Sequence, residues 1–193
     1  MKNVHIDEDD WAEDMSAEAV AARQKDSSSS AINKILDDDN TDVMELFASF
    51  VNGNPDASIE EVKLEALKLG IDDDKVLVIL FQILFSESTL NAASIALKAP
   101  LFKQFLTSEK CQKGLLGGFE RTVGELFPSL LPKTPILLKA LYDNDLVDEE
   151  VILAWGQKAS KRFVDKKVSK EIRTKAEPFL KWLQEAEEDE EED

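Results

Sequence analysis

Residues 58–85 read SIEEVKLEALKLGIDDDKVLVILFQILF, and this stretch decides the fold class. Ser58 and Glu61 have the spacing of a capping box. In such a box the serine hydroxyl accepts a hydrogen bond from the Glu61 amide, and the Glu61 carboxylate accepts one from the Ser58 amide. The pattern therefore predicts a helix that runs to about Leu69. Gly70 follows at the position where a left-handed residue commonly ends a helix.

The second half of the stretch predicts another helix directly after the first. Three aspartates, 72–74, would place carboxylates at the positive end of a helix over Lys75 to Phe85. That helix is apolar on nearly all sides, so we expect it to be buried between neighbours. Its apolar run, 76–85, includes Gln82 and is too short to span a bilayer.

The same kinds of signal predict helices on both sides of this stretch. Pro100 is expected to end one of them, and Gly117–Gly118 marks a close-packing point or a bend. No segment alternates strongly enough to predict a strand. The expected ranges are 41–52, 88–99, one or two helices within 101–127, 134–142, 148–163 and 169–187.

Helices of this length with short connections favour antiparallel neighbours. We therefore predict an all-α fold, a HEAT-like stack of antiparallel helix pairs with disordered acidic tails. No clean internal repeat is present, so a globular helical bundle is the alternative. The predicted organisation is a disordered acidic leader over 1–40, a helical domain over 41–184 and a disordered acidic tail over 185–193.

The charge of the chain is large and unevenly placed. There are 40 acidic and 23 basic residues, for a net charge of −17, and the last ten residues hold eight acids and no base. Residues 158–175 contain eight bases and two acids. Two faces of opposite sign are therefore expected, and the net charge argues against nucleic acid or an anionic membrane as the main partner.

Candidate catalytic groups are few. The one histidine, His5, lies in the predicted leader, and the one cysteine, Cys111, has no histidine beside it in the sequence. No phosphate-binding loop, dinucleotide fingerprint or metal-ligand spacing is present. Asp37–Asp39 with Asp42 lack the glycine and the distal glutamate of a calcium loop. We predict that the chain is not an enzyme and uses no cofactor.

Two segments in the last third combine large aromatic residues with carboxylates. Residues 142–155 read YDNDLVDEEVILAW, and residues 176–185 read AEPFLKWLQE. Helical spacing places Trp155 on one apolar face and Phe179 with Trp182 on another. The aromatic side chains could simply be core residues. The neighbouring carboxylates favour contact with a basic partner, because a rigid backbone presents charge at a small ordering cost.

The sequence of this region resembles a known family. The segments ILLK at 136–139, YDND at 142–145, WGQKASK at 155–161 and KEIRTKAEPFLKWL at 170–183 are similar to the C-terminal two-tryptophan domain of eukaryotic translation initiation factor five. The leader DDWAED at 9–14 also resembles the linker before that domain, and it departs from the linker at Met15.

The resemblance implies a HEAT-type scaffold in the cytoplasm that assembles the translation preinitiation complex. It implies that paired aromatic and acidic boxes bind lysine-rich segments of initiation factor two beta, and that factors three, one and four G are further partners. The GTPase-activating domain of the family is not contained in this sequence. The residues that match the boxes are Tyr142, Asp143, Asp145, Asp148, Glu149, Glu150, Trp155, Glu177, Phe179, Trp182, Glu185, Glu187 and Glu188.

Alternatives to this function remain open at the level of sequence. One is a guanine-nucleotide exchange domain like that of the epsilon subunit of the factor-two exchange factor, and another is a generic acidic chaperone for basic proteins. We expect a monomer that binds no membrane.

The bases within 158–175 form a segment that we name the basic stripe. This stripe is either a solvated face or a second binding site. Its residues are Lys158, Lys161, Arg162, Lys166, Lys167, Lys170 and Arg173.

Overall fold

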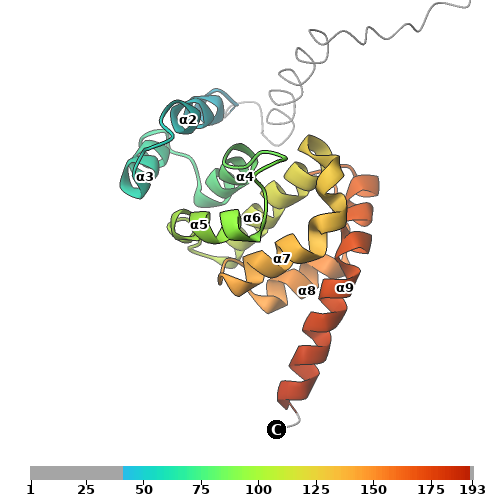
Figure 1. Ribbon diagram of the computed structural model, residues 1–193. Coiled ribbons are helices and arrows are strands. Elements are labelled where there is room, and N and C mark those ends of the chain that lie inside the picture. The colour runs from blue at the N-terminus through green and yellow to red at the C-terminus, as the bar shows by residue number, and fades with distance from the viewer. Residues whose placement is uncertain (1–40, 192–193) are drawn as a thin grey trace, which may run out of the picture.

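The computed structural model describes residues 41–191, which form helices and short connections without a strand (Figure 1). This confirms the predicted all-α class. The predicted leader over 1–40 lies outside the described residues. The helices are α2 (Thr41–Gly53), α3 (Ile59–Lys68), α4 (Asp73–Ile83), α5 (Ala92–Lys103), α6 (Glu109–Arg121), a π-helical turn (Thr122–Leu126), a 3₁₀ helix (Pro128–Lys133), α7 (Thr134–Asp143), α8 (Glu149–Gln157) and α9 (Lys166–Glu191).

The capping box at the start of α3 forms as predicted. The Glu61 amide donates to the Ser58 hydroxyl at 3.2 Å, and the Ser58 amide donates to the Glu61 carboxylate at 2.7 Å. The hydrogen bond that the Ser58 backbone amide donates, and next the one from the Ser58 side chain, lower the pKa of the Glu61 carboxyl. Gly70 follows the helix with φ of +66°, a conformation that glycine adopts without strain. The local signals therefore fix both ends of α3.

Helix α4 lies at the centre of the fold and is packed closely against α6. Its residues Val76 to Phe81 are all buried. A Cβ atom on Gly114 would overlap the Asp74 carbonyl oxygen, and one on Gly118 would lie 2.9 Å from the Val78 carbonyl oxygen. The expected close packing at Gly117–Gly118 is therefore confirmed, with Gly114 one helical turn earlier on the same face of α6.

Replacing Gly114 with alanine tests this close approach. The added methyl group would collide with backbone atoms of α4, which cannot rotate away as a side chain can. We expect the free energy of unfolding to fall by about 1–3 kcal/mol, as measured by urea denaturation. Gly53→Ala is the matched control, because no atom lies within 4 Å of the added Cβ at the end of α2. Equal stabilities of the two variants would contradict the packing.

The helix predicted over 88–99 corresponds to α5, and both of its predicted ends were wrong. The helix is capped by Asn91, whose side-chain oxygen accepts the Ser94 amide at 2.9 Å, and not by Ser88. Pro100 lies inside the helix and does not end it. The reason is tertiary, since Phe102 is fully buried and its ring stacks on Phe81 with centroids 5.9 Å apart. Burial of this ring in the core offsets the backbone hydrogen bond that proline removes.

The last two helices also differ from their predicted bounds. Helix α8 ends at Gln157 and not near 163, and α9 begins at Lys166 and not at 169. The connection between them is held by side chains from elsewhere, since the Ser160 amide donates to the Ser169 hydroxyl and Arg121 donates to the Phe163 carbonyl. Helix α9 continues to Glu191, so the acidic tail expected from residue 185 begins inside a helix.

Candidate functional site

The three C-terminal helices bring the two predicted boxes together. Helix α9 packs against both α7 and α8, and its C-terminal part projects beyond the other helices (Figure 1). Tyr142 at the end of α7 lies 6.3 Å from Phe179 and 6.4 Å from Trp182, measured between ring centroids. Phe179 and Trp182 stack at 5.8 Å. The structure thus joins one aromatic residue of the first box to two of the second.

These three rings differ in how far they reach the surface. Phe179 is buried, Tyr142 is partly buried, and Trp182 is 45% exposed. A large apolar ring that is rigidly supported and open on one side is the usual form of a binding anchor. Trp182 is therefore the aromatic residue of the two boxes that is best placed to contact a partner.

Several carboxylates of the two boxes already hold a basic side chain of the same chain. Asp143 on α7 accepts from Lys139 at 2.8 and 2.7 Å through its two oxygens. Asp145 has a φ of +53° and lies 3.5 Å from the Lys103 ammonium. These pairs are exposed at the surface, where a competing cation can exchange with them at a small cost.

Glu177 on α9 is paired in the same way. Its carboxylate lies 2.9 Å from the Lys181 ammonium, and this hydrogen bond raises the pKa of Lys181. Glu185 is exposed one turn beyond Lys181 and adds to the rise in that pKa through its charge. Glu187 and Glu188 belong to the backbone of α9, but their side chains lie outside the described part of the structure.

The remaining acids of the first box lie at the start of α8. Asp148 accepts from the Gln112 side chain at 2.7 Å, and the Asp148 amide donates back to it at 2.8 Å. This pair of bonds ties α8 to α6. Glu149 is half-buried, whereas Glu150 is exposed. Of the two glutamates, Glu150 is therefore the one more accessible to a partner.

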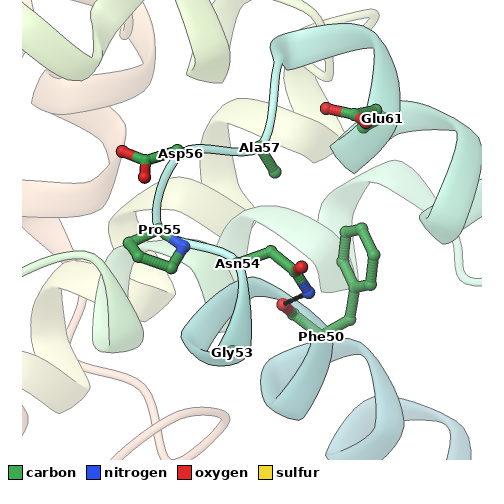
Figure 2. Close-up of a pocket in the computed structure, with 7 residues that line it drawn as sticks. All are labelled: Phe50, Gly53, Asn54, Pro55, Asp56, Ala57 and Glu61. Carbon is green, nitrogen blue, oxygen red and sulfur yellow. Dashed lines mark hydrogen bonds between the residues drawn. The ribbon is translucent and has the colours of Figure 1, made fainter.

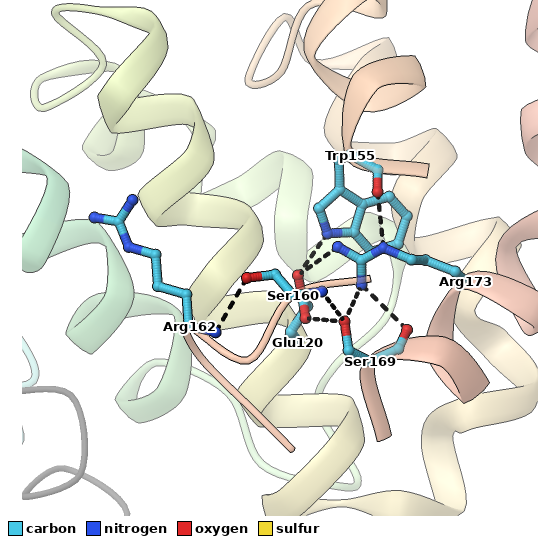
Figure 3. A network of polar contacts seen from close by, with 6 residues as sticks. All are labelled: Glu120, Trp155, Ser160, Arg162, Ser169 and Arg173. Carbon is cyan, nitrogen blue, oxygen red and sulfur yellow. Dashed lines mark hydrogen bonds and ion pairs between the residues drawn. The ribbon is translucent and has the colours of Figure 1, made fainter. Parts of the chain in front are cut away.

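Trp155 has a structural role, which agrees with the interpretation of the aromatic residues as core residues, whereas its polar partners were not predicted. Figure 3 shows it within a network of polar contacts. Its indole nitrogen donates to Glu120 on α6 at 2.6 Å, and the Arg173 guanidinium lies over its ring at 4.3 Å from the centroid. Arg173 also donates to the Trp155 carbonyl oxygen at 2.7 Å. These bonds hold the end of α8 against α6 and α9.

Glu120 is the centre of this network. It is 2% exposed, and it accepts hydrogen bonds from Trp155, from Arg173 at 3.3 Å and from Ser169 at 3.4 Å. A buried carboxylate is tolerated when it is paired and hydrogen-bonded in this way. Sequence reasoning missed Glu120 because a single glutamate in a glycine-rich helix carries no local signal of burial.

One residue of the predicted basic stripe, Arg173, is buried in the structure. Arg173 is 8% exposed and engaged with Glu120, Trp155 and Ser169, so it is not part of an exposed basic face. The reason is that Glu120 and the Trp155 ring lie beneath its position on α9 (Figure 3). The exposed bases of the stripe are Lys158, Lys161, Arg162, Lys166, Lys167 and Lys170.

Two shallow pockets lie in the described region, one at the turn between α2 and α3 and the other beside Glu177 of the second box. Figure 2 shows the one at the turn between α2 and α3, lined by residues including Phe50, Pro55 and Ala57. Its polar side chains serve the turn, since Asn54 donates to the Phe50 carbonyl oxygen at 2.8 Å and Glu61 belongs to the capping box. The other pocket lies between α8 and α9 and is lined by Leu153, Gly156, Gln157, Glu177, Leu180, Lys181 and Gln184.

The part of the chain that the structure describes, 41–191, contains neither a metal site nor a membrane-spanning helix. No three His, Cys, Asp or Glu side chains in this range lie close enough to hold a metal ion, and Asp37–Asp39 fall outside it. None of the helices in this range is both long and apolar enough to cross a membrane. Cys111 is buried, with its sulfur 3.3 Å from the Ser108 hydroxyl.

The fold and the surface define a class of protein, an all-helical domain with paired aromatic and acidic segments. A family model described as W2: eIF4-gamma/eIF5/eIF2-epsilon matches residues 111–193. A solved structure described as "The C-terminal Domain of Translation Initiation Factor 5 at low pH" is 37% identical with a TM-score of 0.69. It is aligned over 78% of this chain and 95% of its own. The chain belongs to this family of translation initiation factor 5 C-terminal domains, and its fold is HEAT-like, as predicted.

Curated translation initiation factors that are longer than this chain support the same assignment. Eukaryotic translation initiation factor 5 of Saccharomyces cerevisiae is 35% identical over all of this chain and 47% of its own length. The factor of Drosophila melanogaster is 34% identical over 95% of this chain and 41% of its own length. The factor of Mus musculus is 43% identical over 69% of this chain and 30% of its own length. The chain thus spans less than half the length of these relatives.

Proposed function

We propose that this chain is a scaffold of translation initiation that binds a lysine-rich segment of the beta subunit of initiation factor two. The binding region is the surface of α7, α8 and α9 around Trp182, which we name the acidic aromatic surface. The observation that carries the proposal is an exposed tryptophan that stacks on Phe179 and lies beside the ion pair of Lys139 and Asp143. The residues of this surface are Tyr142, Asp143, Asp145, Asp148, Glu149, Glu150, Glu177, Phe179, Trp182 and Glu185.

Charge and apolar contact must both contribute to such binding. Exposed ion pairs are worth roughly 0.2–1 kcal/mol each, so five or six give only a few kcal/mol. Micromolar affinity needs about 8 kcal/mol. Contact of a lysine stem or an apolar partner residue with Trp182 would supply part of the difference, because buried aromatic anchors dominate interface energies. The carboxylates then set the encounter rate and the choice of partner.

The salt dependence of binding tests the proposed role of charge. We expect the affinity for a lysine-block peptide to fall by about tenfold or more between roughly 0.05 and 0.3 M salt, because exposed charges are screened over this range. Isothermal titration calorimetry measures the affinity directly, and the same peptide with acetylated lysines is the control. An affinity that does not change with salt would contradict the electrostatic part of the proposal.

The other functions considered predict different results. An exchange domain would accelerate nucleotide release from initiation factor two, whereas the scaffold assigns no catalytic step to the chain. A generic acidic chaperone would bind histones and lysine-block peptides equally well. Initiation factors three, one and four G are proposed as further partners of the same scaffold. Nucleotide release, measured with a fluorescent nucleotide, separates the scaffold from the exchange domain.

A further inference from the structure

The acidic aromatic surface already holds one lysine of its own chain. The Lys139 ammonium contacts both oxygens of the Asp143 carboxylate, and it lies 5.3 Å from the centroid of the Trp182 ring. Both side chains of the ion pair are 48% exposed, and Trp182 is 45% exposed. A carboxylate and an indole ring from two different helices thus converge on one ammonium group at the surface.

These contacts have the chemistry that a lysine of a partner would need. A carboxylate provides the charge-assisted hydrogen bonds, and the ring provides cation–π attraction, which is strongest for tryptophan. Ile136 lies one turn before Lys139 on α7 and is 64% exposed, so it offers apolar contact to a lysine stem. The ring itself is held by Phe179 and Tyr142, so its position does not depend on Lys139 alone.

We propose that Asp143 and Trp182 form a binding subsite for a lysine ammonium group, which Lys139 fills in the free protein. A lysine of the partner enters by exchange with Lys139, which then moves into solvent. Because the ion pair of Lys139 and Asp143 is exposed and lies within one helix, breaking it costs little free energy, and the exchange is reversible. Lys139 therefore acts as an internal competitor that weakens binding and favours partners carrying several lysines. The inference rests on the proposed function, since it names the subsite within the same surface.

Replacing Lys139 with glutamine removes the competing ammonium group and keeps a polar, shorter side chain at the position. We expect K139Q to bind a lysine-block peptide about five- to tenfold more tightly than the original chain, as measured by calorimetry at low salt. K139R keeps a cation at the position, so its affinity should stay close to that of the original chain. Far-UV circular dichroism confirms that each variant is folded.

Removal of one positive charge strengthens binding of a basic peptide even without a subsite, so a charge-matched control is needed. Lys68 on α3 forms an exposed pair with Glu65 at 3.4 Å, remote from α9 (Figure 1). We expect K68Q to change the affinity by less than about twofold. Equal effects of K139Q and K68Q, or no effect of either on a peptide that binds, would overturn the subsite. If neither the original chain nor K139Q binds the peptide at low salt, the proposed function itself fails.

Discussion

Replacing Arg173 with methionine is expected to destabilise the fold by about 3–5 kcal/mol. Methionine fills much of the same space but removes the positive charge opposite Glu120, whose carboxylate is 2% exposed. It also leaves the Trp155 carbonyl oxygen without the donor that Arg173 supplies. Breaking a buried ion pair by removing one partner is costly because the other charge stays buried and unpaired. Chemical denaturation of the original and variant chains measures the change.

Lys170→Met is the matched control for this experiment. Lys170 lies on α9 close to Arg173 but is exposed, so the same substitution should change stability by less than about 0.5 kcal/mol. Combining R173M with Glu120→Gln should recover part of the lost stability, because position 120 then no longer carries a buried negative charge without a partner. If R173M were as stable as K170M, the network of Glu120, Trp155 and Arg173 would not hold α8 and α9 together.

The second large effect is expected at Trp182 and concerns binding. W182A should weaken binding of a lysine-block peptide by about thirtyfold, or roughly 2 kcal/mol, which is the range of an interface anchor. The expected loss combines the apolar contact of the ring with its attraction for a lysine ammonium group. Stability should fall less than in R173M, because Trp182 is 45% exposed. Calorimetry gives the affinity, and denaturation gives the stability.

Leu67→Ala is the control for removal of an exposed apolar side chain. Leu67 is 76% exposed on α3, which lies far from α9 in the fold. We expect its replacement to leave the affinity unchanged. A folded W182A variant that binds as tightly as L67A would show that the ring is not an anchor. The binding would then rest on charge alone, which is too weak by the magnitudes given above.

The fold was predictable where its signals are local. The capping box of Ser58 and Glu61, the glycine at position 70 and the apolar run of α4 each act within a few residues, and each appears in the structure as expected. Pro100 was wrongly predicted to end α5. The backbone hydrogen bond that proline removes is a local effect, whereas the stabilisation that offsets it, burial of Phe102 against Phe81, comes from a different helix. Helix ends set by tertiary contacts cannot be seen in a single sequence.

The candidate site was predictable only in part, for the same reason. Composition and the family resemblance selected two segments that the structure brings into contact, and the structure then separated two roles. Trp155 is tied by its indole nitrogen to buried Glu120, whereas Trp182 is supported from one side and open on the other. Arg173 was assigned to the basic stripe because its neighbours in sequence are basic, and nothing local indicates that it turns inward to Glu120.

The measurement that tests the central claim most directly is a map of where a lysine-block peptide contacts the chain. Backbone amide chemical shifts, followed by nuclear magnetic resonance during a titration, give this map residue by residue. We predict that the largest changes fall on 142–150 and 177–185, the two segments that meet where Tyr142 packs against Phe179 and Trp182. Changes confined to α2 and α3 or to the basic connection over 158–165, with α7 and α9 unaffected, would contradict it.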